Sequence, residues 1–153
     1  MDKIPKVLFL SKGNASRAQI AEGFLRNLAA ERFNPVSAGT DSNSVHPLAA
    51  EVMSEIGVDI STQQPREIAS LFRDTFRYAV VVSDEPHEKH PVFPFTTKML
   101  RWSIPDPELA TGEVGEQKQA FRDVRDLIRD RVDELIEATP PAPVFTEAHA
   151  AAA

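Results

Sequence analysis

Short apolar runs alternate with longer amphipathic stretches along this chain. The apolar runs are typical of buried strands, and the amphipathic stretches have the spacing of helices that cover a sheet. The predicted strands cover residues 7–10, 33–38, 76–82 and 91–96, and the predicted helices cover residues 17–32, 47–56, 66–73 and 116–138. Alternation of strand and helix predicts an α/β fold, a three-layer sandwich with a four-stranded parallel sheet.

Two of the predicted helices carry a clear apolar stripe. The stripe of the first consists of Ile20, Ala21, Phe24, Leu25 and Leu28, and that of the last of Phe121, Val124, Leu127, Ile128, Val132, Leu135 and Ile136. Gly57 follows the second helix and is predicted to cap its carboxyl end. Trp102 opens a proline-rich loop, where it either packs in the core or contacts a ligand.

The length of 153 residues predicts one domain over residues 1–139 that is large enough to bury a core. Residues 140–153 are rich in proline and alanine and are predicted to form a disordered tail. No apolar run reaches bilayer length, and the amino terminus lacks the apolar segment of a signal peptide. We therefore expect a cytoplasmic protein without a membrane partner.

Charge and cysteine content exclude several function classes. The formal net charge of −6 argues against nucleic acid as a partner, because a nucleic-acid surface needs excess positive charge. The chain has no cysteine, which excludes disulfides, thiolate metal sites and thiol redox chemistry. His46, His87 and His90 show no metal-ligand spacing, so neither a metal nor another cofactor is expected.

The loop between the first predicted strand and helix has the features of an anion site. It consists of Ser11, Lys12, Gly13, Asn14, Ala15, Ser16 and Arg17. Small residues at a strand-to-helix turn let successive backbone N–H groups point inward, and the helix dipole favours negative charge there. Arg17 adds a planar fork that fits two oxygens of a tetrahedral anion. These residues predict an oxyanion-binding loop at the carboxyl edge of the sheet.

The chain resembles the low-molecular-weight protein tyrosine phosphatase superfamily, and within it the thioredoxin-coupled and related arsenate reductases. Several motifs carry the resemblance in the family's order over residues 6 to 137. They are the Ser11-x5-Arg17 loop, Gln19–Gly23, Ser37–Thr40, His46–Ala49, Glu55–Ser61, Ser83-Asp84, Trp102, Pro105–Pro107 and Phe121–Asp126.

The resemblance implies roles for matching residues. In the family the loop opens with a nucleophilic cysteine, and Ser11 occupies that position here. Arg17 matches the anion-binding arginine, Asp106 the general acid, and Asn14 a residue that holds the loop's shape. The resolving cysteines of the reductases are absent too, and Ala18 replaces the family's Ser or Thr after the arginine. Asp106 lies between two prolines, so a plain turn residue is the competing interpretation.

Serine cannot replace cysteine in this chemistry. The positive field of such a loop lowers a thiol pKa from about 8.5 into the physiological range, whereas a hydroxyl ionises far above it. Ser11 would need an adjacent base, and Lys12 is the neighbouring candidate in sequence. Serine also cannot form the disulfide that arsenate reduction requires. Anion binding by N–H groups and Arg17 needs no thiol.

Two classes of function remain open. In the first, the protein binds an inorganic oxyanion (arsenate, phosphate or sulfate) or a phosphorylated ligand, without cysteine chemistry and without a thiol redox partner. In the second, it is an enzyme of this family, either working by non-cysteine chemistry or carrying an engineered replacement of cysteine at Ser11. Loss of the nucleophile removes most of the acceleration in such sites, which favours binding.

Overall fold

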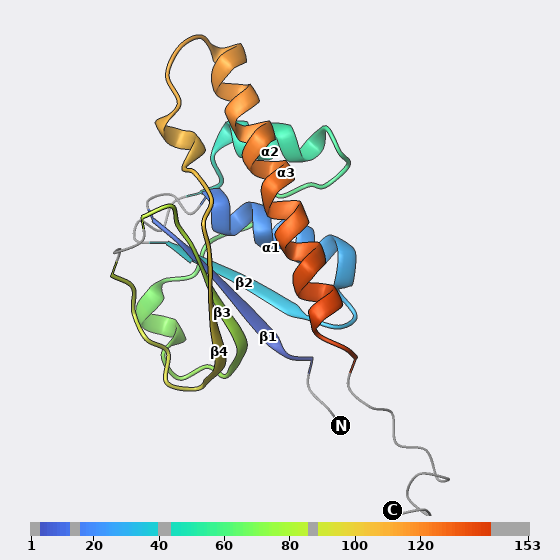
Figure 1. The fold of residues 1–153 in the computed structure, drawn as a ribbon, viewed down its shortest axis with the longest axis vertical. Coiled ribbons are helices and arrows are strands. Elements are labelled where there is room, and N and C mark those ends of the chain that lie inside the picture. Colours follow the sequence, from blue (N-terminus) through green and yellow to red (C-terminus); the bar gives the residue numbers. More distant parts are fainter. Residues whose placement is uncertain (1–3, 13–15, 40–43, 86–88, 142–153) are drawn as a thin grey trace, which may run out of the picture.

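The computed structural model describes residues 4–12, 16–39, 44–85 and 89–141, and it has a four-stranded parallel sheet in the order β2-β1-β3-β4 (Figure 1). The strands are β1 (Lys6–Ser11), β2 (Asn34–Gly39), β3 (Phe76–Val82) and β4 (Thr96–Trp102). The helices are α1 (Ser16–Ala29), α2 (Pro47–Ser54) and α3 (Val114–Ala138), with the short 3-10 helices η1 (Ile68–Leu71) and η2 (Pro107–Leu109). The predicted α/β class and parallel sheet are confirmed.

The sheet separates two hydrophobic clusters. Helices α1 and α3 lie on one face, with α2 packed beside α3, and η1 lies on the other face (Figure 1). Strands β1 and β3 form the centre of the sheet and contribute side chains to both clusters. Their continuous apolar sequences follow from this position, since both of their faces are covered.

The layer opposite the long helices is thinner than predicted. The helix predicted over residues 66–73 is wrong, because only the four residues of η1 are helical there. Arg66 forms a parallel bridge with Ala38, and its backbone N–H donates to the carbonyl of Ser37 at 2.7 Å. That pairing keeps the chain extended along β2, so helical turns begin only beyond Glu67.

The fourth strand lies further along the chain than predicted. The range 91–96 contains two prolines, which cannot donate to a sheet ladder, and the strand is instead Thr96–Trp102. Among the described strands β4 is an edge strand that pairs with β3, and its exposed positions include Lys98 and Arg101. Because charged side chains interrupt its apolar pattern, the sequence signal for this strand was weak.

The carboxyl end of α2 matches its prediction. Gly57 has a φ of +80°, the left-handed conformation that glycine adopts without strain. Its N–H donates to the carbonyl of Ser54, and the N–H of Val58 donates to that of Met53, both at 3.0 Å. This is the Schellman pattern of a helix end.

The predicted apolar stripes are wrong at two leucines, which were expected to be buried. Leu28 on α1 and Leu127 on α3 are 42% and 46% exposed. The buried stripe of α3 is narrower and consists of Phe121, Val124, Ile128, Val132 and Leu135. The predicted tail lies outside the described residues from 142 onward. Within the described ranges, no helix combines the length and apolarity needed to cross a bilayer.

Candidate oxyanion site

The candidate site lies where β1 ends and α1 begins. β1 has β2 on one side and β3 on the other, so the connections after β1 and β3 leave the sheet at adjacent points of its carboxyl edge. Open α/β sheets bind ligands at such a switch point. Of the predicted loop, Ser11, Lys12, Ser16 and Arg17 are described, and Gly13, Asn14 and Ala15 lie outside the described residues.

Ser11 is connected to the first turn of α1. Its side chain is buried, and its Oγ accepts a hydrogen bond from the backbone N–H of Ala18 at 3.1 Å. The N–H groups of a first helical turn have no partner within the helix, so this bond satisfies one of them. Although Ala18 lacks the hydroxyl found in the family, its backbone still supplies a hydrogen bond to the nucleophile position.

Arg17 is buried at the amino terminus of α1, with only 3% of its surface exposed. Its Nη1 donates to the backbone carbonyl of Ile104 at 2.8 Å. Two carboxylates lie further away, Asp84 Oδ1 at 3.6 Å from Nη1 and Asp106 Oδ2 at 3.8 Å from Nη2. The structure therefore brings together Arg17 and Asp106, the two charged residues that the sequence singled out.

The two oxygens of Asp106 have different surroundings. Oδ1 accepts the backbone N–H of Glu108 at 3.0 Å and so caps η2, while Oδ2 faces Arg17. The carboxylate therefore acts as a turn residue through one oxygen and can meet a ligand of Arg17 through the other. The two interpretations of Asp106 are compatible.

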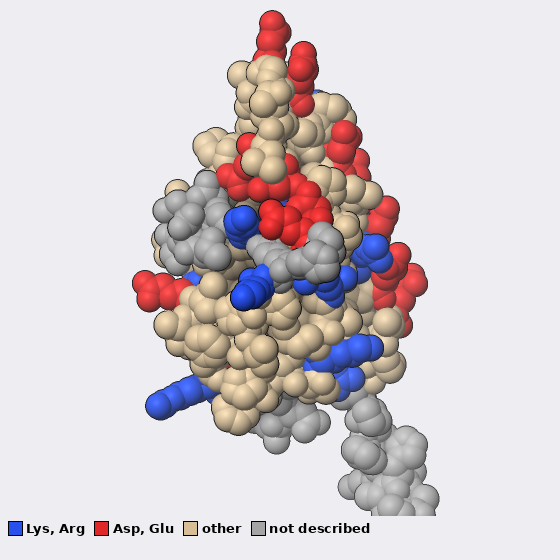
Figure 2. Space-filling model, turned by 60° about the vertical axis from the view of Figure 1, so that its left-hand side comes forward, with Lys and Arg blue, Asp and Glu red and all other residues tan. Residues whose placement is uncertain are grey.

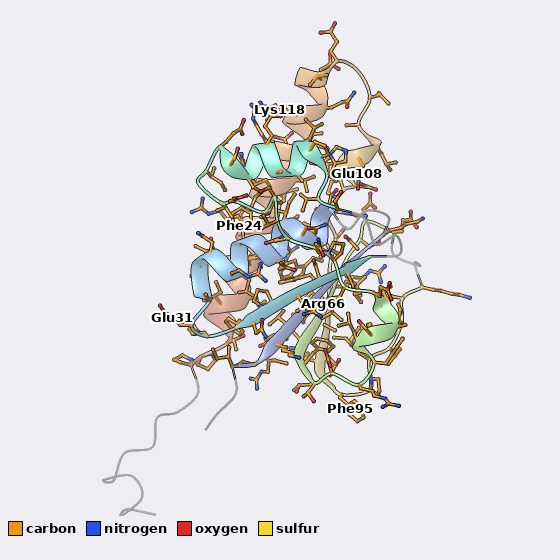
Figure 3. All side chains as sticks on the ribbon, turned by 180° about the vertical axis from the view of Figure 1, so that it is seen from behind. Phe24, Glu31, Arg66, Phe95, Glu108 and Lys118 are labelled. Carbon is orange, nitrogen blue, oxygen red and sulfur yellow. The ribbon has the colours of Figure 1, made fainter. Side chains whose placement is uncertain are left out.

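Three acidic residues near this loop, Asp84, Glu85 and Glu108, had no predicted ligand-binding role, although Asp84 belongs to one of the family's motifs. Ser16 Oγ donates to Glu108 Oε2 at 2.9 Å, and Figure 3 shows Glu108 beside the beginning of α1. Lys12 Nζ lies 3.6 Å from Glu85 Oε1. Asp84 and Glu85 directly follow the short strand continuation at Ser83, so their place at this sheet edge could have been predicted from β3.

The described side chains of the site carry a negative sum of charge. Lys12 and Arg17 contribute two positive charges, and Asp84, Glu85, Asp106 and Glu108 four negative ones, which gives −2. Figure 2 shows acidic side chains gathered on this face, with basic ones at their border. An anion that enters here meets one buried arginine among several carboxylates.

Ser11 also lines a small hollow whose side chains differ from those around Arg17. Its basic and titratable side chains are Lys12, Lys89 and His90. The remaining lining residues are Leu10, Ser11, Ile68, Val81, Val82 and Pro91. This hollow therefore combines basic and apolar side chains, in contrast to the carboxylates that lie near Arg17.

Two other candidate residues serve the fold. His46 Nδ1 accepts the backbone N–H of Leu48 at 3.1 Å and caps α2, and its ring stacks on Phe121. Trp102 is 6% exposed and its ring centre lies 5.6 Å from that of Phe9, so it packs in the core. In the described ranges, no three His, Asp or Glu side chains converge as a metal site would require.

A second cluster of arginines and carboxylates joins α2 to α3. Arg122 donates to Glu55 through Nη2 at 2.7 Å and through Nε at 3.0 and 3.2 Å. Arg125 Nη1 donates to the same carboxylate at 2.9 Å, and Lys118 Nζ lies 3.6 Å from it. Hydrogen bonds from Arg122, followed by those from Arg125 and the nearby positive charges, lower the pKa of Glu55 to about 2.

Comparison with known proteins agrees with the geometry. The family model for low molecular weight phosphotyrosine protein phosphatase matches residues 6–140. An arsenate reductase of Bacillus subtilis is 32% identical over 131 residues, which cover 86% of this chain and 94% of that protein. A glutaredoxin arsenate reductase of Synechocystis is also 32% identical, over 86% of this chain and 95% of that protein.

The similarity extends to solved structures. One described as an arsenate reductase in the phosphate binding state superposes with a TM-score of 0.75 and 31% identity, over 89% of this chain and 99% of that one. The range matched by the family model, residues 6–140, includes every strand and helix and the Ser11–Arg17 loop. This chain therefore belongs to the low-molecular-weight phosphotyrosine protein phosphatase family, in its arsenate reductase branch.

Proposed function

We propose that this protein binds a tetrahedral oxyanion, arsenate or phosphate, between Ser11 and Arg17. The observation that supports this most strongly is that Arg17 is buried and makes few hydrogen bonds. A guanidinium has five N–H donors. Burying a guanidinium costs free energy unless its donors make hydrogen bonds. In the described part of the chain Arg17 makes one hydrogen bond, to Ile104, which leaves donors for a ligand.

Cysteine-dependent reduction and phosphatase chemistry are proposed to be lost. The chain contains no cysteine, and the oxygen at the nucleophile position already accepts the N–H of Ala18. Lys12, the candidate base beside it, is paired with Glu85. In the described part of the chain no basic side chain hydrogen-bonds to Ser11 Oγ, so nothing there activates the hydroxyl.

The relatives support an oxyanion as ligand and suggest how this chain differs from them. One similar structure is an arsenate reductase in a phosphate binding state. Another relative is a glutaredoxin arsenate reductase, whose name links it to a thiol protein. Without a thiol of its own this chain has no group to exchange with such a protein, so we propose that it works without a thiol redox partner.

An enzymatic function is the second candidate, and Asp106 is the observation that favours it. Its Oδ2 lies 3.8 Å from Arg17, so the family's general acid is within reach of a bound ligand. Non-cysteine chemistry would use this group, and an engineered replacement at Ser11 would also leave it in place. The two candidate functions differ in whether the protein turns over a substrate with Asp106 as its general acid.

Calorimetry at low salt with arsenate and with phosphate tests the proposal, together with an assay for p-nitrophenyl phosphate hydrolysis. We expect saturable binding of both anions and no hydrolysis. Absence of binding by the folded protein would contradict the proposal. Hydrolysis that Asp106→Asn abolishes would establish the enzymatic candidate instead.

Ser11→Cys provides the complementary measurement. Gain of phosphatase or thiol-dependent arsenate reductase activity by this variant would show that the rest of the site remains competent for the family's chemistry. The matched control is Ser54→Cys, which places the same thiol on the exposed surface of α2 and should gain neither activity.

A further inference from the structure

We propose that Asp84 makes this site selective for oxyanions that keep a proton at neutral pH, phosphate and arsenate, over sulfate, which keeps none. The inference rests on the proposed function and names the class of anion that the site accepts. Its basis is the place of the Asp84 carboxylate, 3.6 Å from the guanidinium that would hold the ligand.

Asp84 is held in this place by its neighbours. The N–H of Ser83 donates to the carbonyl of Trp102 at 3.0 Å, which continues the pairing of β3 with β4. Ser83 Oγ accepts the N–H of Glu85 at 3.1 Å, and the Arg101 guanidinium donates to the carbonyl of Glu85. The backbone on both sides of Asp84 is therefore fixed to the sheet edge, although the Asp84 side chain is 44% exposed.

Asp84 does not occupy the hydrogen-bond donors of Arg17. At 3.6 Å the Asp84 oxygen is too far from Nη1 for a hydrogen bond, and the bond that Nη1 makes goes to Ile104 at 2.8 Å. An anion that binds the remaining N–H groups of Arg17 then lies close to Asp84. Two negative groups at that separation repel each other in a partly buried site.

A proton on the ligand reverses this repulsion. The O–H of hydrogen phosphate or hydrogen arsenate can donate to the Asp84 carboxylate, which forms a strong charge-assisted hydrogen bond. Sulfate has the same shape and charge as hydrogen phosphate but no proton at neutral pH, so it faces the carboxylate as acceptor against acceptor. Discrimination of this kind by an unpaired acceptor is effective, because the mismatched polar groups stay unsatisfied.

Of the other carboxylates of the site, two are engaged by other side chains and the third keeps one oxygen free. Glu85 is paired with Lys12, and Glu108 accepts from Ser16. Asp106 already accepts the N–H of Glu108 through one oxygen, which leaves one oxygen towards Arg17. Asp84 belongs to the connection after β3, and no hydrogen bond to its oxygens occurs in the described ranges.

Calorimetric titration of the full chain with phosphate, arsenate and sulfate at neutral pH and equal ionic strength tests the inference. We expect phosphate and arsenate to bind at least tenfold more tightly than sulfate. In Asp84→Asn the affinities for phosphate and sulfate should agree within threefold, because the carboxamide removes the repulsion and offers a donor.

Glu85→Gln is the matched control, since it removes the same charge one residue away, from a carboxylate paired with Lys12. It should leave the phosphate-to-sulfate ratio within twofold of the original. Equal affinity of the original protein for sulfate and phosphate would overturn the inference. It would also be overturned if Asp84→Asn left the phosphate-to-sulfate affinity ratio unchanged, or if Glu85→Gln lowered that ratio as much as Asp84→Asn does. Absence of binding by every anion would instead contradict the proposed function itself.

Discussion

Two arginines in this molecule face carboxylates in very different ways. Arg122, on α3, forms hydrogen bonds of 2.7 to 3.2 Å with Glu55 and is one-third exposed. Arg17, at the start of α1, is almost completely buried, yet its carboxylates lie at 3.6 and 3.8 Å. The partly exposed arginine makes close hydrogen bonds with its carboxylate, and the buried arginine does not.

The difference distinguishes a structural contact from the site that we propose binds an oxyanion. Glu55 joins two helices, and its close hydrogen bonds hold its pKa at about 2. Arg17 is surrounded by negative charge without being saturated by it. Burial of a charge with few hydrogen bonds reduces stability, and such costs are typical of functional sites. The predictions below test this contrast.

The largest effect is expected for Arg17→Gln. Removing a buried charge that contacts a ligand directly costs about 2–5 kcal/mol, so the affinity for phosphate should fall roughly thirtyfold or more. Calorimetry measures the change. Arg122→Gln serves as control, because it removes the same charge from α3 and should leave the affinity unchanged. Similar losses in both variants would mean that overall charge, and not the site, binds the anion.

A smaller effect is expected for Ser11→Ala. This variant removes the acceptor of the Ala18 N–H, a loss comparable to that of a helix cap, which lowers the free energy of unfolding by about 1 kcal/mol. Urea denaturation provides the measurement. Ser54→Ala, at an exposed position on α2, should change stability by less than about 0.5 kcal/mol. If the two variants are equally stable, Ser11 does not support α1.

The smallest effect is expected from the pH dependence of the α2–α3 contact. The pKa of Glu55 is about 2 in the folded protein, below its ordinary value of 4.5, so on acidification the carboxylate takes up its proton first in the unfolded chain. The stabilisation is complete above about pH 4.5 and is lost as the pH falls towards 2. Unfolding measured between these values should depend less on pH in Glu55→Gln. If the free energy of unfolding of Glu55→Gln depended on pH as steeply as that of the original protein, other carboxylates would account for the pH dependence.

The central strands, the first helix and the pair of Arg17 and Asp106 could all be predicted from the sequence. Each is encoded by a local pattern or by a motif of the family. The edge strand β4 and the short η1 were predicted wrongly, because tertiary pairing and not local propensity decides their conformation. Contacts such as that of Ser16 with Glu108, 92 residues apart, leave no local signal at all.

The edges of the sheet determine how this protein behaves at high concentration. A free strand edge can pair with a second molecule and start aggregation. Here β2 carries Pro35, which has no N–H to offer, and Arg66 occupies its carboxyl end. On the other side β4 presents Lys98 and Arg101, whose like charges repel an identical strand. β4, the strand whose position was predicted wrongly, thus presents an edge that disfavours strand pairing between molecules.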